Sequence, residues 1–373
     1  MSKIFSLDSS VFMAFNLYSQ SVFIVDNRKA KESAILLSSF ASKIEYVSLE
    51  TTSECLLRPS SRYYVTDKYI VAVSMFEAAY LFDRKTGRYI HQITRRGQAP
   101  GEFVFKCEDQ CGLRNDILYI NNDKYWEGIH IKTKKSMCKI RKPVSIYHKY
   151  NFISNPWPYR DSLFIGYVNN ITGKIDTKLV AFNSAGKVLK EFPNYVIYDH
   201  VGRDKPFFHG VYYEYGGDTY FKQYQGNDTI FLLKNYNLIP HVVFAWNEDQ
   251  KRYQSQPAFS ENQIYMSYFV ETKNYMIYDC QVNGPFVPKE IYQCIYNKKT
   301  GCLQSSRKHN SGFIDDLDFL GEIHPVMAAD TELIDVVPAE KWLDWKKKKS
   351  KMPININVDF DSNPIIRIIH IKS

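Results

Sequence analysis

Tyr80-Leu-Phe-Asp-Arg-Lys-Thr-Gly-Arg-Tyr-Ile90 reads as an apolar strand, a short polar turn that ends in glycine, and a second strand. The same pattern returns as Leu179-Val-Ala-Phe-Asn-Ser-Ala-Gly-Lys-Val-Leu189 and as Ile295-Tyr-Asn-Lys-Lys-Thr-Gly-Cys-Leu303. Asp or Asn at the start of the turn and Gly at its end are what a tight antiparallel connection requires. The three stretches therefore predict β-hairpins.

The spacing of these hairpins indicates a repeat. Weaker copies begin at Ile129 and Ile230, so that the starts at Tyr80, Ile129, Leu179 and Ile230 follow at intervals of 49, 50 and 51 residues. A four-stranded propeller blade takes about 40 to 50 residues. A β-rich pair of segments precedes each hairpin, and two longer units follow the fourth start. The sequence therefore predicts an all-β fold, a six-bladed β-propeller of four-stranded blades.

The last blade is one strand short. It ends in Ile365-Ile-Arg-Ile-Ile-His-Ile-Lys372, and Lys43-Ile-Glu-Tyr-Val-Ser-Leu-Glu50 is the strand-like segment that precedes the first blade. Pairing these two segments removes an open sheet edge. We therefore expect the N-terminal strand to close the last blade. Residues 41–373 then form one propeller domain, residues 1–40 form an extension outside the ring, and one short helical insertion lies near 339–350.

Composition supports a β-rich protein and excludes several partners. Aromatic residues make up 15% of the chain, with 28 Tyr and 24 Phe, which suit a pleated, half-buried surface. The net charge is +8, and the run Lys346–Lys349 with Lys351 supplies five of these charges. We interpret this run as a solvated helix end and expect no nucleic-acid partner. Seven widely spaced cysteines fit neither a disulfide scaffold nor a zinc site. No stretch approaches the ~20 apolar residues of a transmembrane helix.

An ordered set of motifs resembles a known family. The motifs are the closing strand 43–52, the loop Ile93-Thr-Arg-Arg-Gly-Gln-Ala-Pro-Gly-Glu-Phe103, and the segments 226–231, 312–318 and 363–372. Together they resemble the six-bladed β-propeller proteins abundant in Bacteroidetes, which are distant relatives of NHL-repeat propellers. The resemblance covers residues 40–373 and implies the fold and an extracytoplasmic location, in the periplasm or at the cell surface. It implies no catalytic residues, and no signal peptide or lipobox is legible.

The function expected from this resemblance is binding. No nucleophile elbow, phosphate-binding loop, zinc-protease motif or dinucleotide fingerprint occurs in the sequence. We expect a monomeric, non-catalytic propeller of the bacterial cell envelope that binds a small molecule, a glycan or an envelope protein. The alternative is a metal-dependent lactonase- or lyase-like hydrolase with its site at the central channel. No cofactor is predicted, although Ca²⁺ or another divalent cation is possible.

An acidic cluster gives the candidate metal ligands. Asp315, Asp316 and Asp318 lie close together in the sequence, with Glu322 and His324 after them. Several carboxylates that converge on one point can bind Ca²⁺. We expect these residues near the mouth of the channel, with Asp315 and Asp316 also as ligand-binding candidates. The alternative is that both carboxylates accept backbone hydrogen bonds in a turn between blades.

Basic and aromatic residues complete the ligand-binding candidates. Arg95 and Arg96 lie in a Gly- and Pro-containing loop between the first two blades, and a guanidinium group can bind a carboxylate or a phosphate. Trp157, His209 and Tyr212 fall on or near the predicted inner strands, where aromatic faces suit a sugar or another flat ligand. The alternative is structural: a turn in the first case and packing between blades in the second.

Overall fold

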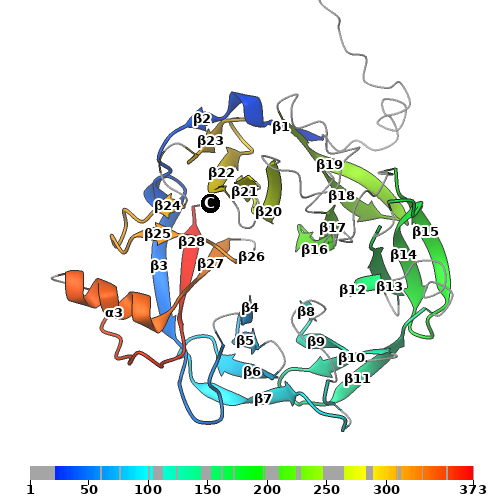
Figure 1. Ribbon diagram of the computed structural model, residues 1–373, viewed down its shortest axis with the longest axis horizontal. Helices are drawn as coiled ribbons and strands as arrows, with labels where there is room; N and C mark the ends of the chain where they lie inside the picture. The colour runs from blue at the N-terminus through cyan, green and yellow to red at the C-terminus, as the bar shows by residue number, and fades with distance from the viewer. Residues whose placement is uncertain are drawn as a thin grey trace, which may run out of the picture.

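The computed structural model is a ring of six antiparallel sheets around a central axis (Figure 1). It describes residues 22–58, 61–74, 77–99, 101–103, 112–122, 125–143, 153–160, 163–170, 173–195, 197, 210–223, 228–246, 264–282, 289–307, 309, 312–329, 331–349 and 352–372. The six-bladed β-propeller predicted from the hairpin repeat is confirmed.

Blades 1 to 3 have four strands each, and in each blade the first strand lies nearest the axis (Figure 1). Blade 1 contains β4 (Arg62–Val65), β5 (Tyr69–Val73), β6 (Ala78–Asp83) and β7 (Tyr89–Arg95). Blade 2 contains β8 (Gly112–Arg114), β9 (Ile117–Asn121), β10 (Tyr125–His130) and β11 (Ser136–Arg141). Blade 3 contains β12 (Ile153–Arg160), β13 (Leu163–Val168), β14 (Thr177–Asn183) and β15 (Val188–Pro193).

Blades 4 and 5 carry a fifth strand from the N-terminal segment on their outer edges. Blade 4 contains β16 (Gly210–Tyr215), β17 (Asp218–Gln223), β18 (Thr229–Lys234) and β19 (Asn237–Ala245), with β1 (Phe23–Asp26) parallel to β19. Blade 5 contains β20 (Ile264–Glu271), β21 (Tyr275–Val282), β22 (Glu290–Asn297) and β23 (Leu303–Ser305), with β2 (Lys31–Glu32) parallel to β23. The described part of the N-terminal extension therefore covers two outer sheet edges, which would otherwise be free to pair with another chain.

Blade 6 joins the two ends of the chain. It contains β26 (Met327–Ala329), β27 (Glu332–Val337), β28 (Ile365–Ile371) and β3 (Ala41–Ser48). Strands β28 and β3 pair antiparallel from Ile365 opposite Ser48 to Ile371 opposite Ala41. The predicted closure by the N-terminal strand is therefore confirmed, because the outermost strand of the last blade comes from the beginning of the chain.

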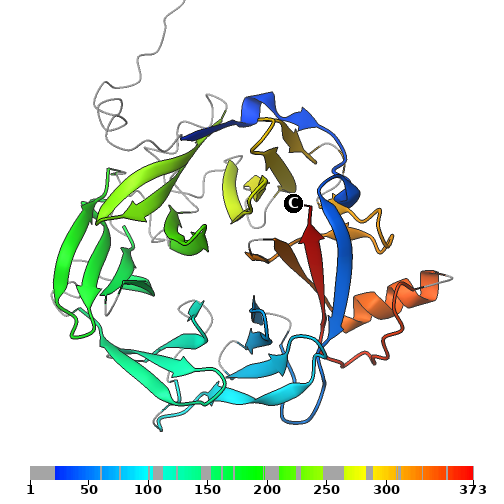
Figure 2. The same cartoon turned by 180° about the vertical axis from the view of Figure 1, so that it is seen from behind.

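A few elements lie outside the blades. Two short 3-10 helices, η2 (Asn27–Lys29) and η3 (Leu37–Ser39), connect the N-terminal strands. The hairpin β24 (Phe313–Ile314) and β25 (Glu322–Ile323) and the helix α3 (Ala339–Lys348) lie outside β3 on the rim of blade 6 (Figures 1 and 2). The predicted helical insertion is confirmed, and Lys346, Lys347 and Lys348 lie in its last turn. Lys349 is its C-cap, and Lys351 lies outside the described residues.

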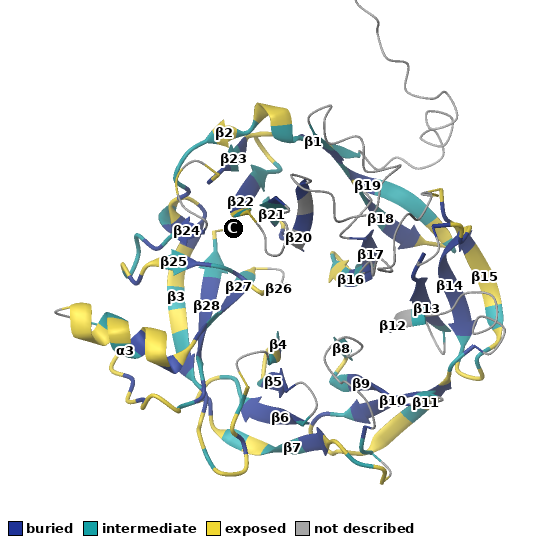
Figure 3. Cartoon of the chain, in the orientation of Figure 1, coloured by how far each residue is buried: buried dark blue, intermediate teal, exposed yellow. Residues whose placement is uncertain are grey.

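The core lies between the blades. Six of the hydrophobic clusters among the described residues each join a pair of neighbouring blades, and a seventh lies under α3. Figure 3 shows the middle strands of the blades mostly buried and the outer strands partly exposed. The described cysteines are free thiols, and Cys107 and Cys111 lie outside the described residues. Among the described residues, no helix has both the length and the hydrophobicity needed to cross a bilayer.

Candidate functional site

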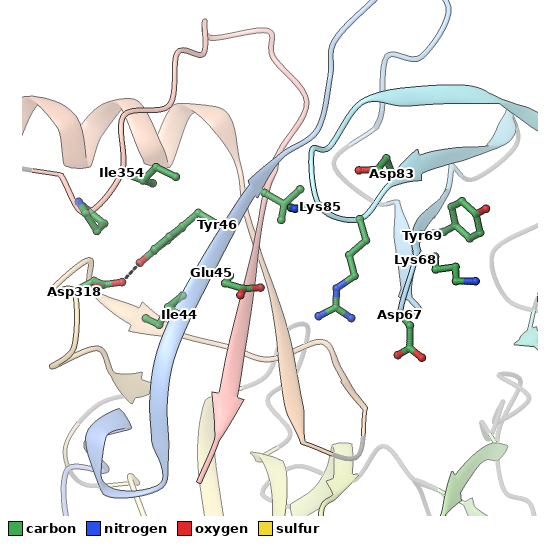
Figure 4. A pocket seen from close by; sticks show the side chains of 13 residues that line it. Ile44, Glu45, Tyr46, Asp67, Lys68, Tyr69, Asp83, Lys85, Asp318 and Ile354 are labelled. Atoms are coloured by element: carbon green, nitrogen blue, oxygen red, sulfur yellow. Dashed lines mark hydrogen bonds between the residues drawn. The ribbon is translucent and has the colours of Figure 1, made fainter.

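A groove of about 890 Å³ opens where blade 6 meets blade 1 (Figure 4). The closing strand β3 forms its floor. The turns of blade 1 form one side, and Asp318 with the segment after α3 forms the other. The groove exists because ring closure places β3, the outer strand of blade 6, beside the turns of blade 1.

Tyr46 lies on the floor of the groove, where contacts with Asp318 and Trp342 hold its side chain. Its hydroxyl donates a hydrogen bond to Asp318 Oδ2 at 2.8 Å, and its ring packs edge-on against Trp342 of α3 with ring centroids 5.4 Å apart. Burial, together with the Asp318 carboxylate, raises the pKa of Tyr46 far above its usual value. Burial also raises the pKa of Asp318. The Tyr46 hydroxyl therefore stays protonated and acts as a hydrogen-bond donor.

The β6–β7 turn of blade 1 is pressed against β3. Asp83 Oδ1 accepts hydrogen bonds from the backbone N and the Oγ1 of Thr86 at 2.8 and 2.7 Å. Gly87 has a φ of +71°, and a Cβ atom at this position would lie 1.9 Å from the carbonyl oxygen of Ser48. Glycine is required here both for the left-handed backbone and for the close approach. The repeat that predicted the hairpin thus also brings blade 1 onto the closing strand.

A series of ionisable side chains connects blade 1 to blade 6 beside the groove. Arg84 Nη2 contacts both carboxylate oxygens of Glu332 at 2.7 and 2.8 Å, and its Nη1 donates to the carbonyl oxygen of Thr66 at 3.1 Å. His370 lies between Glu332, 3.5 Å from Nδ1, and Glu45, 3.3 Å from Nε2. Because Arg84 and Glu332 are only 17% and 14% exposed, this pairing holds the shape of the groove more firmly than a surface ion pair would.

Other charges on the groove are available to a ligand. Asp67, Lys68 and Lys85 line it from the blade 1 side, as Figure 4 shows, and all three are exposed. Their side chains form no hydrogen bond or ion pair with any described residue. The described lining contains no Ser, Thr, Cys or His. The groove therefore offers charges of both signs on fixed turns.

The structure brings together two of the aromatic candidates from the sequence. Trp157 on β12 and Tyr212 on β16 stack with ring centroids 5.8 Å apart and an interplanar angle of 22°. Both belong to the hydrophobic cluster between blades 3 and 4, and burial raises the pKa of Tyr212 well above its usual value. Neither Trp157 Nε1 nor the Tyr212 hydroxyl has a hydrogen-bond partner among the described residues. His209 lies outside the described residues.

Arg114 lies beside this aromatic pair and was not among the binding candidates predicted from the sequence. From β8 of blade 2 its guanidinium donates to the carbonyl oxygen of Pro158 in blade 3 and pairs with Glu214 of blade 4 at 2.6 Å. It also lines a cavity of about 320 Å³ between the innermost strands of blades 1, 2 and 6. The signal in the sequence was an arginine directly before the turn-forming pair Asn115-Asp116, and both of these residues have positive φ angles in the structure.

Arg95 and Arg96 lie away from the aromatic pair, because Arg95 ends the outermost strand of blade 1, β7, and Arg96 follows it. Arg95 Nε donates to Glu102 Oε1 at 2.7 Å, and the backbone N of Ala99 donates to Glu102 Oε2 at 3.0 Å. Arg96 forms an isolated bridge with Phe103. This arrangement agrees with the structural alternative of a turn, and here Glu102 satisfies donors of its own loop. Ligand binding by these arginines stays a prediction.

The three aspartates of the acidic cluster have three different sets of partners. Asp315 accepts hydrogen bonds from the backbone N atoms of Leu317, Asp318 and Leu320 at 3.1, 2.9 and 3.0 Å. Asp316 accepts from the backbone N of Ser38 at 2.8 Å and from its hydroxyl. Asp318 accepts from Tyr46 in the groove. The backbone bonds of Asp315 are those of the turn alternative.

The position of the cluster differs from the expected one. The β24–β25 hairpin that carries it lies on the outer rim beside β3, whereas the innermost strands face the axis (Figures 1 and 2). His324 and Glu322 lie 3.4 Å apart and are about two-fifths exposed. Within the described ranges, no group of three or more His, Cys, Asp or Glu side chains is arranged to hold a metal ion. Metal binding by Asp315, Asp316 and Asp318 stays a prediction.

A profile of a domain of unknown function, DUF4934, matches residues 20–370. The chain belongs to the DUF4934 family. A solved structure similar to this DUF4934 chain is a Bacteroides fragilis protein provisionally described as exported. The two share 14% identity over 94% of this chain and 100% of the other, with a TM-score of 0.69. A DUF4221 family member from Bacteroides vulgatus shares 10% identity over 89% and 97% of the two chains, with a TM-score of 0.51.

These similarities support the fold and the resemblance to Bacteroidetes propellers. At such low identities they carry no residue roles from one protein to another. Among curated proteins, no match is found. The fold of this DUF4934 chain is thus established, and the roles of its residues depend on the geometry of the sites described above.

Proposed function

We propose that the protein is a non-catalytic binding propeller of the bacterial cell envelope, and that the groove between blades 6 and 1 holds its ligand. The observation that carries this proposal is the set of exposed charges of both signs, Asp67, Lys68 and Lys85, on turns fixed by the Arg84–Glu332 pair. Because the turns that carry these charges are already held in place, their backbone loses little entropy when a ligand binds. The groove is therefore organised for recognition before the ligand arrives.

The ligand class follows from the chemistry of the lining. Lysine and carboxylate side chains alternate with apolar surface from Tyr69 and Ile354. This mixture suits an elongated polar ligand with some apolar surface, which in a cell envelope is a glycan or a peptide segment of a neighbouring protein. An extracytoplasmic location is supported by the resemblance to Bacteroidetes propellers and by the similar Bacteroides fragilis protein that is provisionally described as exported.

The proton chemistry of the groove supports a binding role. Tyr46 keeps its proton because burial raises its pKa, and Asp318 is occupied by the Tyr46 hydroxyl. Asp83 accepts hydrogen bonds from its own turn, and Arg84 is paired with Glu332. The groups that remain are exposed charges, whose roles are attraction and orientation of a ligand.

The proposal is tested by ligand-induced stabilisation. The melting temperature of the full chain is measured against a panel of envelope glycans and short charged peptides, because a ligand at 100 times its Kd adds about 2.7 kcal/mol of stability. For any ligand found, Lys68→Glu with Lys85→Glu should weaken binding at least ~10-fold. Glycans and peptides in separate arms distinguish the two ligand classes.

The chain supplies a matched control in another blade. Lys299 occupies the equivalent position of the turn Asn297-Lys-Lys-Thr-Gly301 and is exposed, as Lys85 is in Asp83-Arg-Lys-Thr-Gly87. Lys299→Glu should leave binding unchanged. Equal loss with Lys299→Glu, or none with the groove variants, would remove the groove as the binding site. A loss of stability with EDTA that one metal restores would favour the metal-dependent alternative.

A further inference from the structure

A second cavity lies between the outer strands of blades 3 and 4, away from the groove. Its volume is about 330 Å³. A β-bulge between Thr177 and Leu179 shifts the register of β14 against β15, and Lys178 is the residue that falls at the bulge. A bulge redirects a side chain from the face that strict alternation would give it. Here Lys178 reaches toward blade 4, where its ammonium lies near Gln223 and Phe231.

The ammonium of Lys178 is buried, and its hydrogen-bond partner is a neutral amide. The residue is 4% exposed, and its Nζ donates one hydrogen bond, to Gln223 Oε1 at 3.2 Å. Within the described part of the chain it forms no ion pair. A buried ammonium with a neutral amide as its hydrogen-bond partner is costly unless an anion joins it. Burial lowers the pKa of Lys178 to about 8, while the charge of Asp228 opposes this shift.

The walls of the cavity are aromatic and carry only positive charge. The rings of Phe192, Phe231, Tyr195 and Tyr236 line it, together with Lys178 and the exposed Lys190. Neither aspartate nor glutamate is present in the described lining. Tyr236 has a φ of +58°, an unusual conformation for a bulky residue, and its ring packs against Tyr159 of blade 3 with centroids 6.0 Å apart.

We propose that this cavity binds a small aromatic carboxylate, with the carboxylate on Lys178 Nζ and the ring between the aromatic walls. The volume is at the small end of the range for ligand sites, about 300 to 1,000 Å³, so a ligand of one ring fits best. The bound carboxylate forms an ion pair with the Lys178 ammonium, and the rings of Phe231 and Tyr236 provide surface for stacking. This site is independent of the groove between blades 6 and 1.

The experiment measures binding of benzoate, 4-hydroxybenzoate and the neutral analogue benzamide to the full chain by ligand-observed NMR and calorimetry. We expect the carboxylates to bind with a Kd below about 1 mM and benzamide at least ~10-fold more weakly. Lys178→Met should abolish carboxylate binding. The variant should fold, because an apolar side chain of similar length replaces a buried unpaired charge, and its melting temperature provides the check.

The control is a lysine buried to the same degree in the next blade interface. Lys222 on β17 is 2% exposed and lies over the ring of Phe244, outside the cavity. Lys222→Met should leave benzoate binding unchanged. The proposal is overturned if benzoate and benzamide bind equally, if neither carboxylate binds at millimolar concentration, or if folded Lys178→Met protein binds benzoate as the parent does. If Lys178→Met fails to fold, Leu238→Trp, which fills the cavity, must abolish binding instead.

Discussion

Glu271 is the carboxylate on which a buried charged cluster depends. It contacts His241 Nε2 at 3.0 Å and Lys298 Nζ at 2.7 Å, and the Tyr213 hydroxyl donates to it at 2.7 Å. The side chains of His241, Glu271 and Lys298 are exposed by 8% or less. Phe23 of β1 covers the cluster, 5.8 Å from the His241 ring and 5.6 Å from Lys298 Nζ. A single carboxylate therefore joins blade 4, blade 5 and the N-terminal segment.

Replacing Glu271 with glutamine should lower the free energy of unfolding by about 3 kcal/mol, because it leaves the Lys298 ammonium buried without a counter-charge. The cluster lowers the pKa of Glu271 below its unfolded value. Its stabilisation is thus present above the unfolded pKa of about 4.3 and is lost as the pH falls through the lower folded pKa. Urea unfolding between pH 7 and pH 3 should show a shallower acid loss in Glu271→Gln. An equal loss in both proteins would contradict this assignment, and Glu54→Gln, at an exposed position, is the control.

At the scale of elements, the β24–β25 hairpin and α3 form a cap on the outer face of blade 6. Arg367 of β28 lies beneath them, 1% exposed. Its Nε donates to Asp335 at 2.7 Å, its Nη2 donates to the carbonyl oxygen of Glu322 at 2.8 Å, and Trp345 of α3 covers its guanidinium. Asp315 holds the hairpin loop closed over this arginine. The cap therefore covers a buried arginine and supplies partners for its guanidinium group.

Two neighbouring aspartates should differ in their effect on this cap. Asp315→Ala removes three hydrogen bonds to buried or half-buried backbone donors and should cost about 3 kcal/mol of unfolding free energy. Asp316→Ala removes bonds to half-buried Ser38 and should cost about 1 kcal/mol. Chemical denaturation of both variants gives the comparison, and equal effects would mean that Asp315 does not organise the loop. A calcium-dependent rise in melting temperature that both variants lose would instead support the predicted metal site.

At the scale of the whole molecule, the N-terminal segment acts on three blades in succession. It pairs with blade 4 through β1, with blade 5 through β2 and with blade 6 through β3. Only β3 completes a four-stranded blade, and β1 and β2 cover sheets that are already complete. The three strands therefore contribute differently, because the loss of β3 opens the ring while the loss of β1 and β2 uncovers edges.

Successive truncations should separate these contributions. A chain starting at residue 23 keeps all three strands and should unfold as the full chain does. A chain starting at residue 34 loses β1 and β2 and should remain folded, with a lower melting temperature. A chain starting at residue 50 loses β3 and should aggregate, since β28 becomes a free edge. Melting curves and size-exclusion chromatography measure both effects, and a soluble, cooperatively folding chain from residue 50 would contradict closure by β3.

Local signals account for the part of the fold that the sequence predicted. The Asp or Asn and Gly turns gave the hairpins, their spacing gave the blades, and the strand predicted over 43–50 is observed over Ala41–Ser48. Strands β1 and β2 escaped prediction because they are short and pair in parallel with distant strands, so no hairpin turn marks them. Parallel pairing leaves no local signal in a sequence.

The candidate sites were less predictable because they depend on distances across the ring. Trp157 and Tyr212 stack because they are aromatic residues on the inner strands of adjacent blades. Ligand binding by them stays a prediction. The groove was missed because it joins turns such as those of Arg84 and Glu332, which are 248 residues apart. The Asp315 loop was placed at the channel because its sequence position between two blades does not reveal whether it lies at the axis or on the rim.

The closing strand also has a consequence for the order of synthesis. Strand β3 is translated before β4 and every later strand, yet its partner β28 ends at Ile371, two residues before the last residue of this sequence. A ribosome therefore releases β3 long before the strand that it pairs with exists. Ring closure is necessarily a late event in the life of each new chain, and any passage of the chain through a narrow translocation pore must precede it.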